Sequence, residues 1–145
     1  LGVYQVIPVA MKRCVVKLDD KKASSKLTRW QGIAEAAAKQ SKRGIIPQIT
    51  KVMTFAQALE YSRTAQVRLV PYELAEGMDR TREIIEQIQP GQDIAVFIGP
   101  EGGFDEAEIG KVIEAGTQPI TLGKRILRTE TAGMTVLSIL MYHLE

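Results

Sequence analysis

The sequence is poor in the residues that most often build covalent or metal centres. Its 145 residues include one cysteine, Cys14, and one histidine, His143. A single cysteine cannot form an internal disulfide, and one cysteine with one histidine is too few for a typical zinc site. We therefore expect no metal, and we interpret Cys14 as a small buried residue and His143 as a surface or interface residue.

The sequence also has no long apolar run and no signal-peptide pattern. No stretch reaches the roughly 18 apolar residues that a membrane-spanning helix requires, and the first residues, Leu-Gly-Val-Tyr, have no signal-peptide pattern. Hydrophobic residues nevertheless make up 45% of the chain, which suits a globular core. We therefore expect one cytoplasmic domain with no membrane partner.

Charge is unevenly distributed along the chain. Residues 12–51 hold eleven Lys and Arg against three Asp and Glu, a net charge of +8, and the rest of the chain holds eight against fourteen, a net charge of −6. A basic block beside an acidic body fits a surface for a polyanion such as nucleic acid. A solvated helix face with a chance excess of lysine fits the same counts, so composition alone leaves both interpretations open.

Hydrophobic periodicity predicts strands that alternate with helices, which favours an α/β layered sheet with parallel strands and no internal repeat. The run 93–98 (DIAVFI) is the strongest strand signal, since a continuous apolar run suits a strand covered on both faces. The predicted strands are 4–9, 66–71, 93–98 and 119–122, and the predicted helices are 24–40, 54–59, 79–88, 105–116 and 129–144.

Several helix ends carry local signals. Ser24 or Ser25 is the expected cap of the first long helix, and Thr54 is the expected cap of the short helix that follows. Asp105 with Glu108 three residues later resembles a capping box. The predicted apolar stripe of this later helix consists of Ile109, Val112 and Ile113, and Gly116 is placed to end the helix. The last helix is apolar on nearly every side, so we expect it to be buried between layers or against another subunit.

The loop FIGPEGGF follows the strongest strand and precedes a helix. It lacks the lysine and hydroxyl of a phosphate-binding P-loop. Glu101 would repel a phosphate at ~4 Å by about 4 kcal/mol at an effective dielectric constant of 20. The loop is therefore suited to a neutral or positively charged ligand approached by backbone groups, or it is a structural strand-to-helix turn.

A second segment, LGKRILRTETA, also follows a short strand and enters a helix. It combines one glycine, three basic side chains within five residues, and Glu130 near a helix N-terminus, where the helix dipole would stabilise an acid. If the two preceding strands are neighbours, both loops lie at one edge of the sheet, where ligands of open α/β sheets bind.

Together, FIGPEGGF and LGKRILRTETA resemble the two cofactor loops of the ribosomal RNA methyltransferases that modify uridine N3 in 16S rRNA, a family of the SPOUT superfamily. The segments LGVYQVIPVAMKRCVVKL, RWQGIAEAAAKQSKRGIIP and VPYE are similar to family segments in the same order. Family members often have glutamates where Ala36 and Lys39 stand here, which puts any role for those acids in doubt.

The resemblance implies a SPOUT-type parallel sheet with helices on both faces and a C-terminal trefoil knot. It also implies a homodimer with the active site near the subunit interface. By the same resemblance, residues 1–145 are a fragment of the catalytic domain that lacks an N-terminal RNA-binding domain and a first strand and helix; a start at Leu1 rather than Met agrees with this.

The resemblance also implies the cofactor S-adenosylmethionine and a set of site residues. Arg128 is the first candidate to stabilise negative charge on the uridine oxygens and Arg125 the second, and Glu130 is either a general base or a helix-end residue. Tyr72 is either a third wall of the cofactor site or an ordinary aromatic residue at a strand end. The implied cofactor-binding residues are Tyr72, Glu73, Ile98, Gly99, Pro100, Glu101, Gly102, Gly103, Leu122, Gly123, Ile126, Leu127, Thr131 and Ala132, and the implied RNA-binding residues are Arg13, Lys26, Arg29, Gln40 and Arg43.

The implied substrate is 16S rRNA in the small ribosomal subunit. Two other functions stay open at this point: a related knotted enzyme that modifies another RNA position, and an RNA-binding module that has lost catalysis. The complete LGKRILRTETA segment speaks against the second. A nucleotide-phosphate enzyme is disfavoured by the missing lysine and by Glu101.

Overall fold

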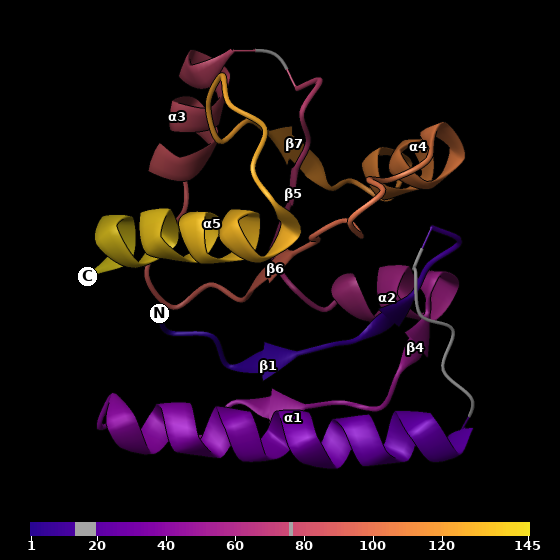
Figure 1. The fold of residues 1–145 in the computed structure, drawn as a ribbon. Helices are drawn as coiled ribbons and strands as arrows, with labels where there is room; N and C mark the ends of the chain where they lie inside the picture. Colours follow the sequence, from indigo (N-terminus) through magenta and orange to yellow (C-terminus); the bar gives the residue numbers. More distant parts are fainter. Residues whose placement is uncertain (14–19, 76) are drawn as a thin grey trace. The chain divides into compact units, whose positions relative to one another are not determined.

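The structure is a computed structural model that describes residues 1–13, 20–75 and 77–145 (Figure 1). Cys14 lies outside the described residues, and so does the prediction made for it. The chain divides into two compact units, one formed by Gly2–Ala58 and the other by Leu59–Glu145 together with Leu1. The units are described separately.

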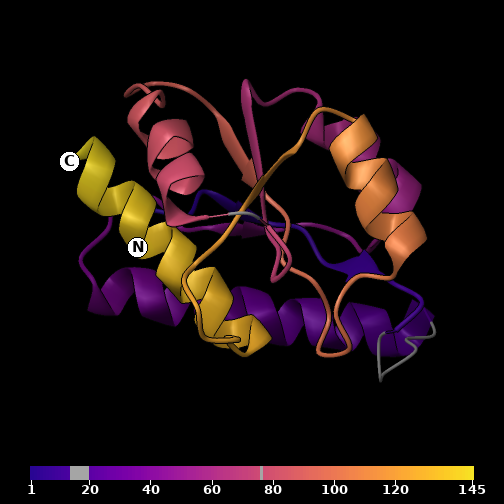
Figure 2. The ribbon, with the colours of Figure 1, turned by 90° about the horizontal axis from the view of Figure 1, so that it is seen from above.

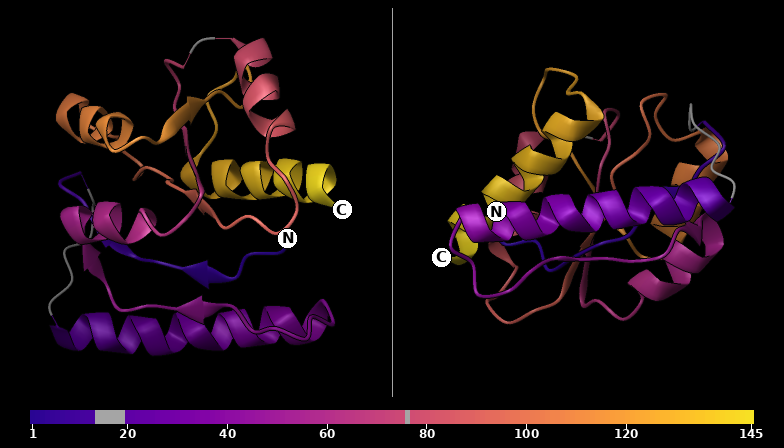
Figure 3. Two further views of the ribbon diagram at one scale, coloured as in Figure 1. Left: turned by 180° about the vertical axis from the view of Figure 1, so that it is seen from behind. Right: turned by 60° about the horizontal axis from the view of Figure 1, so that its bottom comes forward.

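The unit Gly2–Ala58 contains two short parallel strand pairs and one long helix. Strand β1 (Gln5–Val6) pairs with β3 (Gln48–Ile49), and β2 (Val9–Ala10) pairs with β4 (Met53–Thr54). Helix α1 (Asp20–Gln40) runs alongside β3 (Figure 3). The unit therefore consists of one helix packed beside two small parallel ladders.

Two predictions for this unit need correction. The expected strand 4–9 is split into two, because Pro8 has no N–H to donate; its carbonyl oxygen instead accepts a hydrogen bond from Met53 N at 2.9 Å. Helix α1 begins at Asp20, so Ser24 and Ser25 lie inside the helix and do not cap it. Its predicted end at Gln40 is confirmed.

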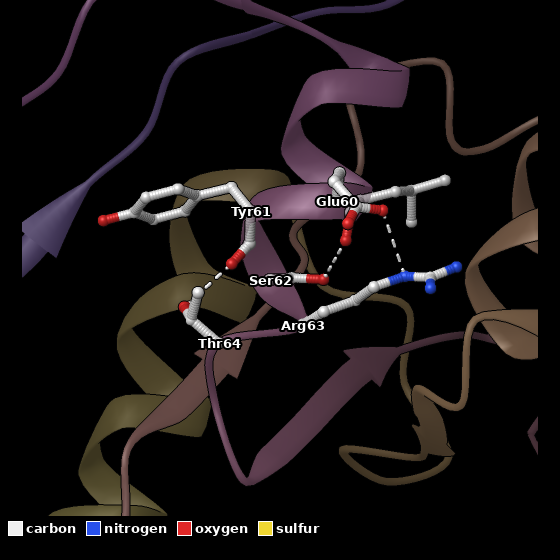
Figure 4. A network of polar contacts seen from close by, with 6 residues as sticks. Glu60, Tyr61, Ser62, Arg63 and Thr64 are labelled. Atoms are coloured by element: carbon white, nitrogen blue, oxygen red, sulfur yellow. Dashed lines mark hydrogen bonds and ion pairs between the residues drawn. The ribbon is translucent and has the colours of Figure 1, made fainter.

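Helix α2 (Phe55–Ser62) begins with a reciprocal pair of hydrogen bonds. Thr54 Oγ1 accepts from Gln57 N at 3.2 Å, and Gln57 Oε1 accepts from Thr54 N at 2.9 Å. The predicted cap at Thr54 is thus confirmed. Short-range contacts close the other end (Figure 4): Ser62 Oγ donates to the Leu59 carbonyl, Thr64 Oγ1 donates to the Tyr61 carbonyl, and Arg63 pairs with Glu60 at 3.3 Å.

The unit Leu59–Glu145 is built on a three-stranded parallel sheet in the order β6-β5-β7. Its strands are β5 (Val67–Pro71), β6 (Ile94–Val96) and β7 (Gln118–Ile120). The consecutive residues Leu69 and Val70 point to opposite faces of β5, and each is 0% exposed. The central strand β5 is therefore covered on both faces.

Helices cover this sheet from both sides. Helices α3 (Met78–Glu86) and α5 (Thr129–Leu144) lie on one side, and α4 (Glu106–Glu114) lies on the other (Figure 2). The main apolar core lies on the side of α3 and α5 and comprises Val67, Leu69, Ile84, Ile85, Ile88, Ile120, Val136 and Leu140. The predicted α/β architecture with parallel strands is confirmed for this unit.

Three details differ from the sequence prediction. Strand β6, expected to be covered on both faces, is a half-buried edge strand of the described sheet. The strands that precede the two glycine loops are not neighbours, because β5 lies between β6 and β7. Ile113, expected on the buried stripe of α4, is 43% exposed, whereas Ile109 and Val112 are buried.

The ends of α4 and α5 follow local chemistry. Asp105 Oδ1 accepts from Glu108 N at 2.7 Å and Glu108 Oε2 accepts from Asp105 N at 3.0 Å, so the predicted capping box is confirmed. Gly116 ends α4 with φ of +85°. At the end of α5, His143 Nε2 lies 3.0 Å from the carbonyl oxygen of Ile88.

Helix α5 is buried along only part of its surface. Val136 and Leu140 are buried, while Met134 and Tyr142 are 54% and 90% exposed. The expected burial of α5 between layers is therefore met only in part, at Val136 and Leu140, and burial against another subunit stays a prediction. None of the described helices combines the length and the hydropathy needed to cross a membrane.

Candidate functional site

The candidate site lies where the three parallel strands of the second unit end. Because the strands are parallel, the segments after β5, β6 and β7 all leave the same edge of the sheet. Two backbone hydrogen bonds extend the ladder by one residue: Phe97 N donates to Leu69 O at 2.8 Å, and Tyr72 N donates to Ile120 O at 2.9 Å. Tyr72, the first residue after β5, therefore lies between the points where the two glycine loops start.

The loop after β6 folds as a tight turn. Gly103 N donates to Pro100 O at 2.8 Å, and Gly103 has φ of +69°, a conformation that favours glycine. The ring of Phe104 lies against Gly99, where a β carbon would meet Phe104 Cε2 at 3.0 Å. The backbone conformation thus favours glycine at position 103, and the contact with Phe104 favours glycine at position 99. Glu101 at the tip of the turn is exposed.

The loop after β7 is fixed at its start by hydroxyl groups. Thr121 N donates to the buried Thr81 Oγ1 at 2.9 Å, which ties the loop to α3, and Gly123 N donates to Thr121 Oγ1 at 3.3 Å. Gly123 has φ of +116°, so a larger residue there would be strained. Sequence reasoning missed Thr81, because a threonine among charged residues of a helix carries no pattern.

The two loops share an apolar base. Ile98, near the start of the first loop, and Leu122, near the start of the second, both pack on the core on the α3 and α5 side of the sheet. A β carbon placed on Gly133 in α5 would lie 3.9 Å from Ile98 Cγ1. The segment that follows the second loop therefore contacts the first loop, although β5 separates the two strands.

The charged residues predicted for this site are all on the surface. Lys124, Arg125 and Arg128 are exposed, and their side chains form no ion pair or hydrogen bond within the described part of the chain. Glu130 is exposed in the first turn of α5, where the helix dipole favours an acid. Thr131 and Ala132 in the same turn are half-buried.

Tyr72 lines a cavity of about 400 Å³ beside the free edge of β7, and Glu73 is exposed. None of the residues around this cavity comes from the loop 99–103 or from the loop 122–127. The cavity is lined by Tyr72, Leu74, Ala75, Arg80, Ile84, Ile113, Gln118 and Pro119. Tyr72 thus shares this cavity with residues of α3, α4 and β7.

The RNA-binding candidates lie in the unit Gly2–Ala58. Lys26 and Arg29 are on α1, three residues apart and thus on one side of the helix, and Lys26 Nζ lies 6.0 Å from the centre of the Trp30 ring. Arg43 donates to the carbonyl oxygens of Val3 at 2.7 Å and Gly2 at 3.3 Å. Arg13 and Gln40 are exposed.

Metal ligands are not gathered anywhere in the described residues: no group of three or more His, Cys, Asp or Glu side chains could hold an ion there. The two loops, their backbone groups and the cations beside them make up the candidate site.

Comparison with known proteins agrees with this arrangement. A model of the RNA methyltransferase domain family matches residues 1–141. The chain belongs to the RNA methyltransferase domain family. The domain is 38% identical over 148 residues to ribosomal RNA small subunit methyltransferase E of Bacillus subtilis, and 37% identical over 138 residues to the protein of the same name from Mesomycoplasma hyopneumoniae.

These matches cover 100% and 95% of the RNA methyltransferase domain, and 58% of the length of each relative. A solved structure of ribosomal RNA small subunit methyltransferase E from Neisseria gonorrhoeae bound to S-adenosyl methionine matches with a TM-score of 0.80 and 32% identity. That match covers 99% of this chain and 56% of the other.

Proposed function

We propose that this RNA methyltransferase domain transfers a methyl group from S-adenosylmethionine to small-subunit ribosomal RNA. The observation that carries the proposal is the shared apolar base of two glycine loops, Ile98 and Leu122, at one edge of a parallel sheet. The names of the relatives support the RNA, and the S-adenosyl methionine bound to one of them supports the cofactor.

The residues present fit this cofactor. Glu101 is a carboxylate at the tip of the first loop, and none of Ile98–Gly103 is a cation, so a ligand with positive charge suits the loop better than a phosphate. Backbone groups of the two loops would read the edge of the adenine, and the half-buried Ile98, Leu122 and Leu127 would line its ring. When bound, S-adenosylmethionine supplies an electrophilic methyl group on a sulfonium.

The remaining cofactor residues are proposed as a surrounding wall. Tyr72 and Glu73 leave the sheet between the two loops, and Thr131 and Ala132 sit in the first turn of α5 close behind the second loop. The other backbone contacts proposed are Gly99, Pro100, Gly102, Gly103 and Gly123.

For the acceptor we propose N3 of a uridine, as the family resemblance implies. This nitrogen carries a proton at neutral pH, so negative charge develops on the base oxygens as the proton leaves. We propose that the exposed side chain of Arg128, which pairs with no other described side chain, stabilises that charge, and that Arg125 is the second candidate. Glu130 is the proposed general base, although its place in the first turn of α5 also fits a purely stabilising role.

RNA contacts are proposed for Arg13, Lys26, Arg29 and Gln40. Arg43 donates two hydrogen bonds to backbone carbonyls, so we propose that it orders the segment before β1 and contributes only charge to RNA binding.

We further propose that the chain forms a trefoil knot and that the protein is cytoplasmic. We also propose a homodimer formed through the exposed apolar face of α5. Sedimentation at several concentrations tests the dimer, and a monomer at all of them contradicts it.

Calorimetry with S-adenosylmethionine and with ATP tests the cofactor. We expect binding of S-adenosylmethionine and none of ATP, and the reverse result contradicts the proposal.

An Arg128→Ala variant tests the proposed chemistry. The methylation rate should fall by about 10²–10³-fold, while affinity for S-adenosylmethionine stays nearly unchanged. Arg82→Ala is the control, because Arg82 is an exposed α3 residue paired with Asp79.

A further inference from the structure

The loop after β7 presents one apolar side chain to solvent. Leu122 and Leu127 in this loop are half-buried, whereas Ile126 is 82% exposed. Among the described aliphatic residues no other large side chain is so exposed; Leu74 follows at 73%. Single exposed apolar residues are common on protein surfaces, so exposure alone does not assign a role to Ile126.

The charges around Ile126 set it apart. Lys124, Arg125 and Arg128 flank it, all are exposed, and none has an ion-pair partner among the described residues. Elsewhere in the same unit, exposed arginines do have acidic partners: Arg82 lies 2.7 Å from Asp79 and Arg80 lies 3.3 Å from Glu83. The loop therefore combines an apolar tip with three cations that lack protein partners.

This combination fits an unpaired strand of nucleic acid better than a protein surface. The cores of protein interfaces are depleted in charge, so docking Ile126 into one would bring the three cations into a poorly solvated place. Proteins that bind single strands pair cations with the backbone and stack aromatic side chains on the bases. Enzymes that take a base out of the stack hold it between aromatic or apolar side chains. A β-branched side chain has a restricted χ1, so Ile126 loses little freedom on contact.

We infer that Ile126 is the side chain against which an unpaired base of the RNA packs, while Lys124 contacts an adjoining phosphate. The inference rests on the proposed function, since it requires an RNA acceptor. The inference assigns Ile126 to RNA and leaves the half-buried Leu122 and Leu127 to line the cofactor. Because Ile126 offers no hydrogen-bonding group, it would select for an unpaired base and not for the identity of that base.

The test uses the whole 145-residue chain with a single-stranded RNA oligomer that carries 2-aminopurine, and with the same oligomer in a duplex. We expect Ile126→Ala to weaken binding of the single strand by about five- to tenfold, at the lower end of base-stacking effects, and to leave duplex binding unchanged. Ile126→Leu should restore most of the affinity. Ile113→Ala, which changes an isoleucine 43% exposed on α4, is the matched control and should have no effect.

Cofactor calorimetry on the same variants separates this inference from the proposed function. If Ile126→Ala binds single-stranded RNA as tightly as the original chain, or if it loses S-adenosylmethionine affinity instead, the inference is overturned and the proposed function stands. A change in sedimentation without a change in RNA affinity assigns Ile126 to a protein contact and also overturns it. Failure of the original chain to bind S-adenosylmethionine counts against the proposed function, whatever Ile126 does.

Discussion

At the residue scale, two buried threonines of one unit stand in opposite situations. Thr81 is 4% exposed and its hydroxyl accepts from Thr121 N at 2.9 Å, whereas Thr117 is 2% exposed and its hydroxyl has no hydrogen-bond partner among the described residues. A buried hydroxyl without a partner costs free energy, and removing one member of a buried pair leaves the other unsatisfied. The same substitution should therefore have opposite effects at the two positions.

We expect Thr117→Val to leave the free energy of unfolding unchanged or to raise it by up to about 1 kcal/mol, and Thr81→Val to lower it by about 1–3 kcal/mol. Urea denaturation of both variants measures the difference. If Thr117→Val lowers the free energy of unfolding as much as Thr81→Val does, the expected difference between the two hydroxyl groups is contradicted.

Gly116 is constrained by its backbone and by a neighbour. Its φ of +85° lies in the left-handed region, and a β carbon there would meet Arg68 Nη2 at 2.9 Å. The backbone term alone costs other residues about 1–2 kcal/mol, and the Arg68 side chain would also have to move. We expect Gly116→Ala to lower the free energy of unfolding by at least about 1 kcal/mol.

Gly110, inside α4, provides the control for Gly116, which follows the end of that helix. It lies inside α4, and a β carbon there would meet no atom within 4 Å. Alanine favours helix over glycine by about 1 kcal/mol, so Gly110→Ala should stabilise the chain. Equal effects at both positions in thermal unfolding would show that the left-handed turn does not set the stability of this helix end.

At the element scale, Gln31 joins α1 to the strand beside it. Its Nε2 donates to Pro47 O at 3.1 Å and its Oε1 accepts from Ile49 N at 2.9 Å, so one side chain satisfies two backbone groups at β3. Gln31→Ala removes both hydrogen bonds and should cost about 1–3 kcal/mol. Gln31→Glu keeps the acceptor and loses the donor, so we expect an intermediate loss in chemical denaturation.

A matched control is Gln40→Ala, which changes an exposed glutamine at the end of α1. We expect almost no effect from it. If Gln31→Ala is equally mild, β3 is held by its ladder with β1 alone and the side-chain contacts contribute little. Hydrogen exchange at Ile49 N would report the same loss directly, because this amide donates to Gln31.

At the scale of the whole molecule, charge is separated along the chain. Residues 12–51 carry a net charge of +8 in an otherwise acidic protein. If this block contacts phosphates, RNA binding releases counterions, and affinity should fall steeply between 50 and 200 mM salt. We expect Lys26→Ala and Arg29→Ala each to reduce the slope of log affinity against log salt by about one.

A flat salt response in filter binding would contradict this use of the basic block. Lys111→Ala is the control, since Lys111 lies on α4 outside the block, and it should leave the slope unchanged. Salt dependence reports on phosphate contacts, whereas the base contact inferred for Ile126 should persist at high salt. The two kinds of contact can therefore be separated in one titration series.

The sequence by itself determined the parts of this protein that depend on near neighbours in the chain. The caps at Thr54 and Asp105, the helix end at Gly116 and the two glycine loops follow from residues within a few positions of one another, because caps and turns are satisfied locally. The family was also indicated by the sequence, because the resemblance was carried by two short segments whose residues are consecutive in the chain.

Tertiary structure decided which elements lie side by side, because pairing and burial depend on residues far apart in the chain. An apolar run such as 93–98 does not reveal its place in a sheet, and here the covered central strand is β5 while β6 is at the edge. Strand order then separates the two loops by β5, and the packing of Ile98 and Leu122 on one core, with α5 beside Ile98, brings them together again. The exposure of Ile126 likewise came from the fold of its loop, since an isoleucine between Arg125 and Leu127 gives no sign of pointing outward.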